Sequence, residues 1–327
     1  LQYTGGTTGL AKGVMLTHYN LIANTIQTSN WTYKSQVGKE IFLAALPFFH
    51  VFGLTVLMNK AIHLAGTLIL IPRFNTNLML KLIKKHRPTV FPGAPTMYIA
   101  LINHPKIQQY DLSSIKICIS GSSPLPLEVQ ETFEKLTQGR LIEGYGLTEA
   151  SPVTHANNIW GKRKIGSIGI PFPDTEAMVV DVDSGEEVPL GEVGELLVKG
   201  PQVMKGYWNR EKETQKVLKE GWLFTGDLAK MDEDGFFYIV DRKKDMIIAS
   251  GFNIYPREIE EVLFEHPMVK EAVAVGVSDK YRGETVKAYI VLKAGAKVTE
   301  QELDQWCRER LAAYKVPKQY AFREDLP

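Results

Sequence analysis

A short segment rich in glycine and threonine near the amino end has the residue types that bind phosphate. Residues 3–13 read YTGGTTGLAKG and include Thr4, Gly5, Gly6, Thr7, Thr8 and Lys12. Glycines allow tight turns that direct backbone N–H groups at an anion, threonine hydroxyls add donors, and a lysine adds positive charge. The order Lys12-Gly13 excludes the P-loop signature, and the spacing does not match G-x-G-x-x-G. Taken alone, the segment fits a phosphate-binding loop and a solvent-exposed turn equally well.

Two more glycine-containing segments follow predicted strands. The apolar run 115–120 ends at Gly121, Ser122 and Ser123, and residues 141–142 lead into EGYGLTE at residues 143–149. Other strands are predicted at residues 41–49, 67–71 and 89–91, with helices after Thr17 and at residues 78–83, 97–102 and 127–136. Alternating strands and helices predict an α/β fold with a parallel-rich sheet and flanking helices. Ligands of such sheets bind beyond the carboxyl ends of the strands, where all three glycine-containing loops fall.

The pattern changes near residue 166, where short β segments alternate with turns. Strands are predicted at residues 177–182, 195–199 and 236–240, with turn signals at residues 183–185 and 234–235. This pattern predicts a small antiparallel β barrel or sheet. The acidic groups at residues 181–183 and 232–234 lack EF-hand spacing, so we interpret them as solvated turns rather than calcium sites.

Five consecutive charged residues, 241–245, precede a small α+β unit. Pro256 is expected to open a helix that runs to Phe264, and strands are predicted at residues 273–277 and 288–292. Thr299 and Glu302 have the spacing of a capping box. We predict two domains. They are residues 1–241, with an α/β part (1–165) and a barrel-like part (166–241), and a C-terminal domain of residues 242–327.

The composition argues against several classes of function. A formal net charge of +1 gives no support for a nucleic-acid-binding surface. Two cysteines, Cys118 and Cys307, cannot form a disulfide framework and suggest a reducing compartment. No apolar run approaches the roughly 18 residues of a membrane span. The seven histidines show no zinc-ligand spacing.

Six segments are far more specific together than any one of them alone. They occur in one order, at residues 3–13, 46–53, 145–149, 221–228, 240–245 and 250–256. The set resembles the acyl-adenylate-forming superfamily of acyl-CoA synthetases, firefly luciferase and peptide-synthetase adenylation domains, and the resemblance covers essentially the whole chain. Within this superfamily, residues 143–145, 199–208 and 241–256 are similar to the bacterial long-chain fatty-acid–CoA ligases.

The resemblance implies an enzyme with a two-step reaction. A fatty acid carboxylate attacks the α-phosphate of ATP to give an acyl-adenylate and pyrophosphate, and the thiol of coenzyme A then displaces AMP. Because two anions must meet in the first step, the site needs a metal ion, cations and oriented N–H donors. The implied cofactors are ATP or AMP, Mg²⁺ and coenzyme A.

The resemblance also implies roles for particular residues. The β- and γ-phosphates are expected to contact Thr4, Gly5, Gly6, Thr7, Thr8 and Lys12. The adenine slot is expected to consist of Gly121, Ser122, Ser123, Glu143, Gly144 and Tyr145, with Tyr145 stacked on the base. Thr148 is expected at the α-phosphate, Glu149 at Mg²⁺, and Asp227 at the ribose with Arg242 nearby. His50 is expected where the acyl and thiol groups approach, and Gly251 and Tyr255 are expected to contact coenzyme A. Lys244 is expected at an interdomain hinge. Catalytic roles therefore fall to His50, Thr148, Glu149 and Lys244.

The chain departs from the family pattern at both ends. The family has a large segment before the glycine-rich loop, and a later lysine that contacts the carboxylate and α-phosphate during adenylation. Neither is present in this sequence. We therefore expect a fragment that adenylates poorly by itself.

Two other functions stay open at this point. One is a ligase for another acid, which could be aryl, short-chain or loaded onto a carrier protein. The other is a non-catalytic nucleotide-binding fragment, against which the intact Lys12, Glu149 and Asp227 argue. A fatty acid substrate and a cytoplasmic location are expected, with no nucleic-acid partner. Peripheral contact with the inner face of the membrane and homo-oligomer formation are left open.

Overall fold

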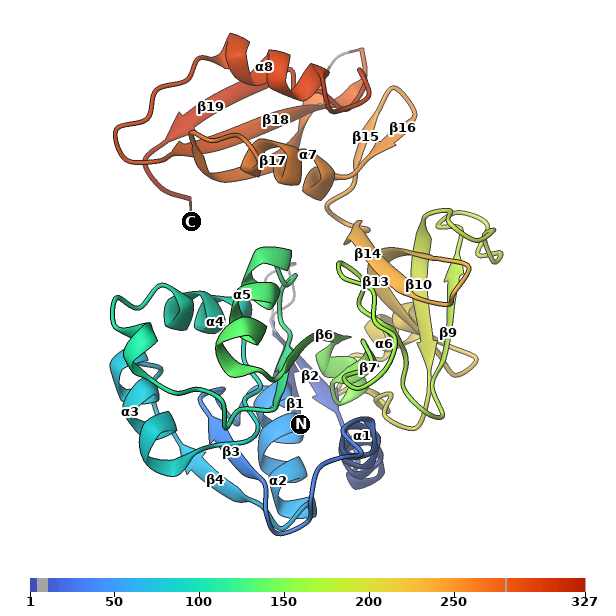
Figure 1. Ribbon diagram of the computed structural model, residues 1–327. Coiled ribbons are helices and arrows are strands. Elements are labelled where there is room, and N and C mark those ends of the chain that lie inside the picture. The colour runs from blue at the N-terminus through green and yellow to red at the C-terminus, as the bar shows by residue number, and fades with distance from the viewer. Residues whose placement is uncertain (5–10, 280, 327) are drawn as a thin grey trace. The chain divides into compact units, whose positions relative to one another are not determined.

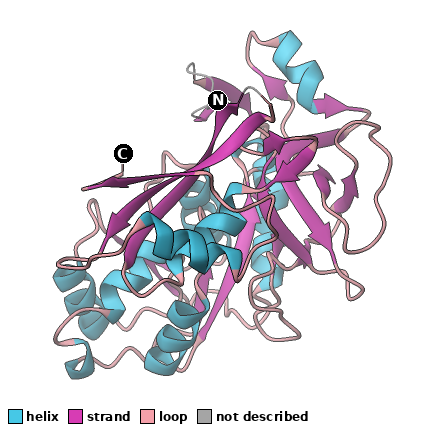
Figure 2. Cartoon of the chain, turned by 90° about the horizontal axis from the view of Figure 1, so that it is seen from above, coloured by secondary structure: helices cyan, strands magenta, loops and turns pink. Residues whose placement is uncertain are grey.

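The structure, a computed structural model, describes residues 1–4, 11–279 and 281–326 (Figure 1). Contacts divide the chain into two compact units. Unit 1 comprises residues 1–192, 196–225 and 231–238, and unit 2 comprises residues 193–195, 226–230 and 239–327. Helices and strands occur along the whole chain (Figure 2), which confirms the predicted α/β class.

Short parallel strands form the centre of unit 1. β3 pairs with β4 and β5 pairs with β6, and Val90 bridges both Phe42 and Ile117 in parallel. The strands are β3 (Ile41–Ala44), β4 (Thr67–Leu70), β5 (Ile117–Ser120) and β6 (Arg140–Gly146). Where a strand is predicted at residues 89–91, only the isolated bridge at Val90 forms. Pro88 and Pro92 flank this position, and neither has the N–H group that a longer ladder needs.

Both faces of β3 and β5 are largely buried. Phe42 and Ala44 join one apolar cluster, whereas Leu43 between them joins the other, as the two-residue period of a strand requires. One cluster includes side chains of the π-helix η1 (Gly53–Asn59) and of α2 (Lys60–His63). The other includes side chains of α3 (Thr76–His86), α4 (Pro95–Ile102) and α5 (Leu127–Thr137). Helices therefore flank both faces, as predicted.

Helix α1 (His18–Trp31) buries polar side chains and exposes apolar ones. Its buried residues are Asn20, Asn24, Thr25, Gln27, Thr28 and Ser29, and its exposed ones include Tyr19, Ile22 and Ile26. The hydroxyls of Thr25 and Ser29 donate to carbonyls of α1 itself. The amide of Asn24 donates to the Val153 carbonyl at 2.7 Å and accepts from the Val153 N–H at 3.1 Å. Helix α1 is thus fixed by hydrogen bonds on its buried face rather than by an apolar stripe.

Several short strands complete the sheets. β6, β7 (Val153–Ala156) and β8 (Ile170–Pro171) continue from β5 in the order β5-β6-β7-β8. A separate sheet has the order β1-β2-β11, and another has the order β12-β13-β10-β9 with β14 beside β13. The strands of these two sheets are β1 (Gln2–Thr4), β2 (Lys12–Met15), β11 (Gly206–Tyr207), β12 (Leu218–Lys219), β13 (Trp222–Met231), β10 (Gly194–Lys199), β9 (Glu176–Val180) and β14 (Phe237–Arg242).

The carboxyl-terminal part of unit 2 is a sheet with two helices. Its order is β16-β15-β18-β17, with β19 parallel to β18. The elements are β15 (Ile247–Ala249), β16 (Phe252–Ile254), α7 (Pro256–Phe264), β17 (Val269–Asp279), β18 (Gly283–Leu292), α8 (Glu300–Arg308) and β19 (Gln319–Arg323). Pro256 opens α7, and the capping box of Thr299 and Glu302 opens α8, so both predicted helix starts are correct.

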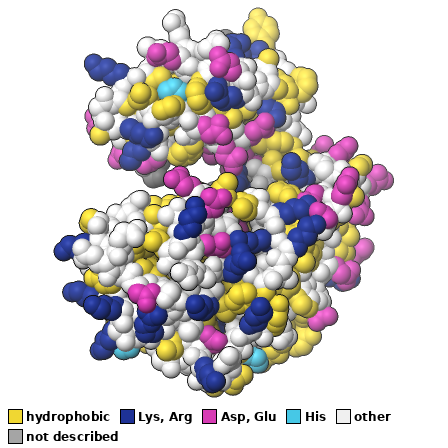
Figure 3. Space-filling model, in the orientation of Figure 1, with side chains coloured by type: hydrophobic (Ala, Val, Ile, Leu, Met, Phe, Trp, Pro, Cys, Tyr) yellow, Lys and Arg dark blue, Asp and Glu magenta, His cyan; other side chains and the backbone are white. Residues whose placement is uncertain are grey.

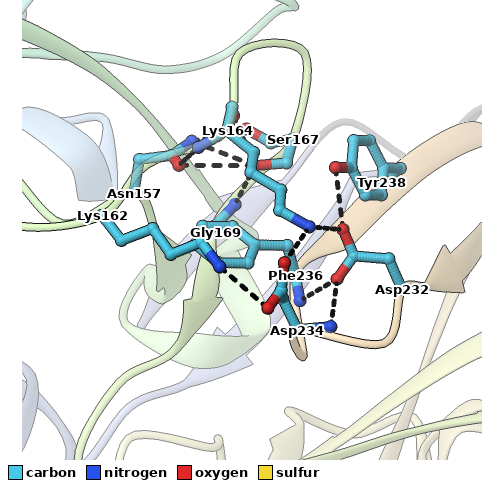
Figure 4. Close-up of polar contacts among 9 residues, drawn as sticks. All are labelled: Asn157, Lys162, Lys164, Ser167, Gly169, Asp232, Asp234, Phe236 and Tyr238. Carbon is cyan, nitrogen blue, oxygen red and sulfur yellow. Dashed lines mark hydrogen bonds and ion pairs between the residues drawn. The ribbon is translucent and has the colours of Figure 1, made fainter.

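Lys164 and two aspartates join the loop before β8 to the turn between β13 and β14 (Figure 4). The Lys164 ammonium lies 2.5 Å from an Asp232 oxygen and 2.6 Å from an Asp234 oxygen. Asp232 also accepts from the Tyr238 hydroxyl and from the Phe236 N–H. Burial alone would raise the pKa of Asp232, but these hydrogen bonds outweigh it and lower the pKa to about 2.

We expect Asp232→Asn to destabilise the chain at neutral pH but to have little effect near pH 2. A carboxyl group whose pKa is lowered by folding stabilises the native state above its unfolded pKa, and this contribution disappears as the pH falls through the folded pKa. Urea unfolding of both proteins between pH 2 and pH 7 measures the difference, with the exposed Glu233→Gln as the matched control. A difference that is constant across this range would contradict the role of the charge.

The surface is balanced in charge. Lys and Arg side chains are interspersed with Asp and Glu on the face shown in Figure 3, as the small net charge predicts. Within the described part of the chain, none of the helices combines the length and the hydropathy needed to cross a membrane.

Candidate nucleotide site

The lysine of the glycine-rich segment lies at the base of a hairpin. β1 and β2 are antiparallel, and their register places Thr4 opposite Lys12. Gly5, Gly6, Thr7 and Thr8 lie outside the described residues. β11 pairs with the other edge of β2, with Tyr207 opposite Val14. This pairing brings a segment distant in sequence next to the hairpin.

Tyr207 links Lys12 to Glu149. The Lys12 ammonium lies 4.9 Å from the centre of the Tyr207 ring, within the range of a cation–π contact. The Tyr207 hydroxyl donates to Oε1 of Glu149 at 2.6 Å. Burial and then the Glu149 carboxylate raise the pKa of Tyr207, so the hydroxyl remains a donor. The sequence places Tyr207 in a segment similar to the family but gives no sign of this contact.

Glu149 is placed by a short helix and by backbone contacts. It lies in η3 (Thr148–Ala150), which follows β6 and also holds Thr148. Its carbonyl accepts from the Met204 N–H at 2.8 Å. Mg²⁺ prefers oxygen ligands and commonly uses one or two carboxylates together with substrate phosphates. No group of three or more candidate ligand side chains occurs among the described residues, so a single carboxylate that shares Mg²⁺ with phosphates fits this donor set.

The pairing of β5 with β6 brings the two segments of the predicted adenine slot next to each other. Ser120 is opposite Glu143 in the parallel ladder, and a carboxylate oxygen of Glu143 accepts from the Leu125 N–H at 3.4 Å. A methyl group added at Gly121 would lie 3.5 Å from the Gly144 carbonyl oxygen and 3.2 Å from the Phe52 ring. The loop with Gly121, Ser122 and Ser123 therefore lies against the strand that carries Glu143, Gly144 and Tyr145.

His155 lies beside Tyr145 and was not predicted. The two residues are opposite each other in β6 and β7, with ring centres 6.0 Å apart, and the Phe237 ring lies 4.8 Å from His155. Burial lowers the pKa of His155 to about 3, so the imidazole is neutral. Its Nδ1 lies 2.9 Å from the Thr154 hydroxyl, and its buried Nε2 has no hydrogen-bond partner among the described residues.

His50 lies just before η1. Its Nδ1 accepts from the Phe52 N–H at 3.2 Å, and burial lowers its pKa. The side chain remains exposed, and Phe52 is the residue that approaches Gly121. These contacts place His50 near the adenine loop.

The residues predicted for the ribose lie in unit 2. Nε of Arg242 lies 3.9 Å from a carboxylate oxygen of Asp227, across β13 and β14. The next residue, Lys243, forms a 2.8 Å ion pair with Glu195. The other oxygen of Glu195 accepts from the Gly226 N–H at 3.1 Å. Glu195, which the sequence does not single out, thus holds Lys243 close to Asp227.

The remaining predicted residues lie at two turns of unit 2. Lys244 is 3.6 Å from Asp245, in a turn where the N–H groups of Asp245 and Met246 donate to the Arg242 carbonyl. Ser250 and Gly251 both have positive φ and join β15 to β16, as a type I′ hairpin turn requires. Tyr255 precedes α7, and burial raises its pKa.

Comparison with known proteins identifies the class of protein to which this fold and these residues belong. The family model described as AMP-binding enzyme matches residues 1–208, and the model described as AMP-binding enzyme C-terminal domain matches residues 258–327. The chain belongs to the AMP-binding enzyme family.

Particular relatives are similar over the whole chain. The long-chain-fatty-acid–CoA ligase of Bacillus subtilis (strain 168) is 61% identical over 327 residues, and that of Escherichia coli O6:H1 is 49% identical over 331 residues. In both cases the match covers 100% of this chain and 58% of the relative. The chain therefore spans less than two thirds of the length of these relatives.

Solved structures are similar in fold and carry nucleotides. ATP-bound MatB from Rhodopseudomonas palustris has a TM-score of 0.91 and 36% identity, covering 99% of this chain and 64% of that chain. The o-succinylbenzoate coenzyme A synthetase MenE from Bacillus subtilis, in complex with ATP and magnesium ion, has a TM-score of 0.88 and 35% identity. The match covers 100% of this chain and 66% of that chain.

Proposed function

We propose that this chain carries the nucleotide-handling part of an AMP-forming fatty acid–CoA ligase that acts on long-chain acids. The observation that carries the proposal is the placement of Lys12 and Glu149 on either side of Tyr207, in a chain of the AMP-binding enzyme family. The identity to long-chain-fatty-acid–CoA ligases over the whole chain supports the substrate class.

In the first step, the fatty acid carboxylate forms a bond to the α-phosphorus of ATP while the bond to pyrophosphate breaks. Lys12, with Thr4 and the glycine-rich loop, holds the β- and γ-phosphates. Thr148 donates to the α-phosphate, and Glu149 holds Mg²⁺, whose charge offsets the repulsion between the two anions. These roles stabilise the charge that builds up on the leaving pyrophosphate.

Two separate groups of residues contact the nucleoside in this proposal. Tyr145 stacks on adenine in the slot of Gly121, Ser122, Ser123, Glu143 and Gly144. Asp227, oriented by Arg242, accepts hydrogen bonds from the ribose hydroxyls. A neutral imidazole behind Tyr145 supports the stacking surface without adding a charge.

In the second step, the thiolate of coenzyme A attacks the acyl carbon and AMP leaves. His50 lies at the approach of the acyl and thiol groups, and Gly251 and Tyr255 contact coenzyme A. Lys244 is the hinge about which the C-terminal part moves between the two steps, and residues 242–327 form that mobile domain. A cytoplasmic location follows because ATP and coenzyme A are both available there.

A second candidate is a ligase for a different acid. Its support is the similarity to MenE, whose acid is o-succinylbenzoate and which matches this chain at 35% identity. Both candidates use the same nucleotide site and differ only in the acyl group.

Calorimetry on this chain tests the proposal. We expect binding of ATP and AMP, and tighter binding of a non-hydrolysable long-chain acyl-adenylate analogue than of AMP. The o-succinylbenzoyl analogue serves as the matched control, and tighter binding of that analogue would favour the second candidate. Absence of binding to every adenine nucleotide would overturn the function.

A further inference from the structure

Tyr207 contacts both Lys12 and Glu149. Its ring faces the ammonium, and its hydroxyl faces the carboxylate. No ion pair joins Lys12 and Glu149 directly within the part of the chain that the structure describes. Opposite charges attract, so a lysine and a glutamate that contact the same residue would form an ion pair if that residue did not lie between them.

Tyr207 is itself held rigidly. The residue is 6% exposed, and β11 pairs with β2 so that Tyr207 is opposite Val14. Its N–H donates to the Thr214 hydroxyl at 2.9 Å, and Thr214 lies in α6 (Glu211–Val217). A buried side chain with only two torsions, on a backbone held by a strand and by the Thr214 hydroxyl, can restrain the more flexible lysine and glutamate.

The hydrogen bond from Tyr207 involves only one of the two carboxylate oxygens of Glu149. The Tyr207 hydroxyl occupies Oε1, whereas Oε2 of Glu149 has no hydrogen-bond partner among the described residues. A carboxylate with one oxygen fixed by a side-chain donor has the arrangement of a metal ligand oriented by an outer partner.

We propose that Tyr207 is a positioning residue that keeps Lys12 and Glu149 apart, so that the lysine remains available to phosphate and the carboxylate to a divalent cation. The inference rests on the proposed function, because it takes Lys12 and Glu149 as the phosphate and metal contacts. Without the ring and hydroxyl, the two side chains pair with each other, and each loses affinity for its ligand.

Two variants separate the hydroxyl from the ring. Tyr207→Phe keeps the surface under Lys12 and removes only the donor to Glu149. Tyr207→Leu removes both contacts. Trp208→Phe is the matched control, since Trp208 is a half-exposed neighbour whose backbone N–H donates to the Gly13 carbonyl.

The measurement is Mn²⁺ binding by electron paramagnetic resonance, with and without ATP, together with calorimetry of metal-free AMP. For Tyr207→Phe we expect about a tenfold weaker Mn²⁺ affinity in the presence of ATP, the scale at which outer partners of metal ligands act. Its affinity for AMP should change less than about twofold, because no described contact of Tyr207 is with the adenine slot. Tyr207→Leu should lose Mn²⁺ affinity and also ATP affinity.

The outcomes separate the inference from the function. If the unaltered chain binds ATP and Mn²⁺ but Tyr207→Phe binds Mn²⁺ equally well, the positioning role is wrong and the function stands. If Tyr207→Phe loses AMP and Mn²⁺ affinity to the same extent, the effect is structural, and the inference is overturned. If the unaltered chain binds neither ATP nor Mn²⁺, the function and the inference fall together.

Discussion

Raising the pH from 7 to 10 should make this chain more stable, because of a lysine buried beneath α1. Lys60 is 1% exposed, and its ammonium donates to the Thr28 carbonyl at 2.9 Å. Burial lowers its pKa to about 7, and nearby Glu40 opposes this change only in part. The unfolded lysine keeps its proton to a much higher pH, so between these two values the unfolded state binds more protons, and stability rises with pH.

The gain should reach roughly 4 kcal/mol by pH 10, at about 1.4 kcal/mol for each pH unit over which the two states differ by one proton. Lys60→Met keeps the length of the side chain and removes the ammonium, so it should abolish the rise and be more stable than the unaltered chain near pH 7. Urea unfolding followed by tryptophan fluorescence at pH 7, 8, 9 and 10 measures both effects.

Lys39→Met is the matched control for this experiment. Lys39 is exposed, so this substitution should leave the pH dependence as it is in the unaltered chain. Parallel stability curves for Lys60→Met and the unaltered chain would show that Lys60 is not the titrating group.

Lys12→Met should weaken ATP binding by about 10- to 100-fold while leaving AMP binding nearly unchanged. A hydrogen bond to a charged group contributes about 1.5–3 kcal/mol, and AMP lacks the β- and γ-phosphates that Lys12 is proposed to contact. Methionine retains an apolar stem against Tyr207, so the hairpin should stay folded. Calorimetry with both nucleotides at one salt concentration gives the two ratios.

Lys205→Met controls for a general loss of positive charge in the same region. Lys205 is exposed, and its N–H pairs with the Met15 carbonyl of β2, so its removal should affect ATP and AMP alike and only slightly. An equal fall in ATP and AMP affinity for Lys12→Met would place Lys12 away from the terminal phosphates.

The α/β architecture is predictable from the sequence because its signals are local. The apolar runs at β3 and β5 indicate strands buried on both faces, and the alternation of Phe42 and Leu43 between two cores agrees with this. The capping box at Thr299 and the proline at the start of α7 each lie within four residues of the helix start that they indicate. Boundaries are less accurate: the strand predicted at residues 41–49 ends at Ala44.

The elements that the sequence does not reveal depend on distant partners. β11 has two residues and exists because it pairs with β2, nearly two hundred positions earlier. The inverted polarity of α1 arises because its amide side chains meet carbonyls of residues such as Val153 and Pro201. No periodicity within the helix predicts these partners.

The site residues also divide into those that a local motif indicates and those that only distant contacts reveal. Lys12, Tyr145 and Asp227 stand in motifs, so a resemblance can assign their roles, which remain predictions. The roles that we propose for Tyr207 and His155 rest on contacts with residues far away in the chain. A tyrosine beside a tryptophan and a histidine in a short strand have no sequence signal that distinguishes them from ordinary core residues.

His155 stays uncharged beside Tyr145 over a wide range of pH. Because burial lowers the pKa of this imidazole to about 3, mild acidification adds no charge to His155. If adenine stacks on Tyr145 as proposed, protonation of His155 would not change nucleotide binding between neutral pH and about pH 4.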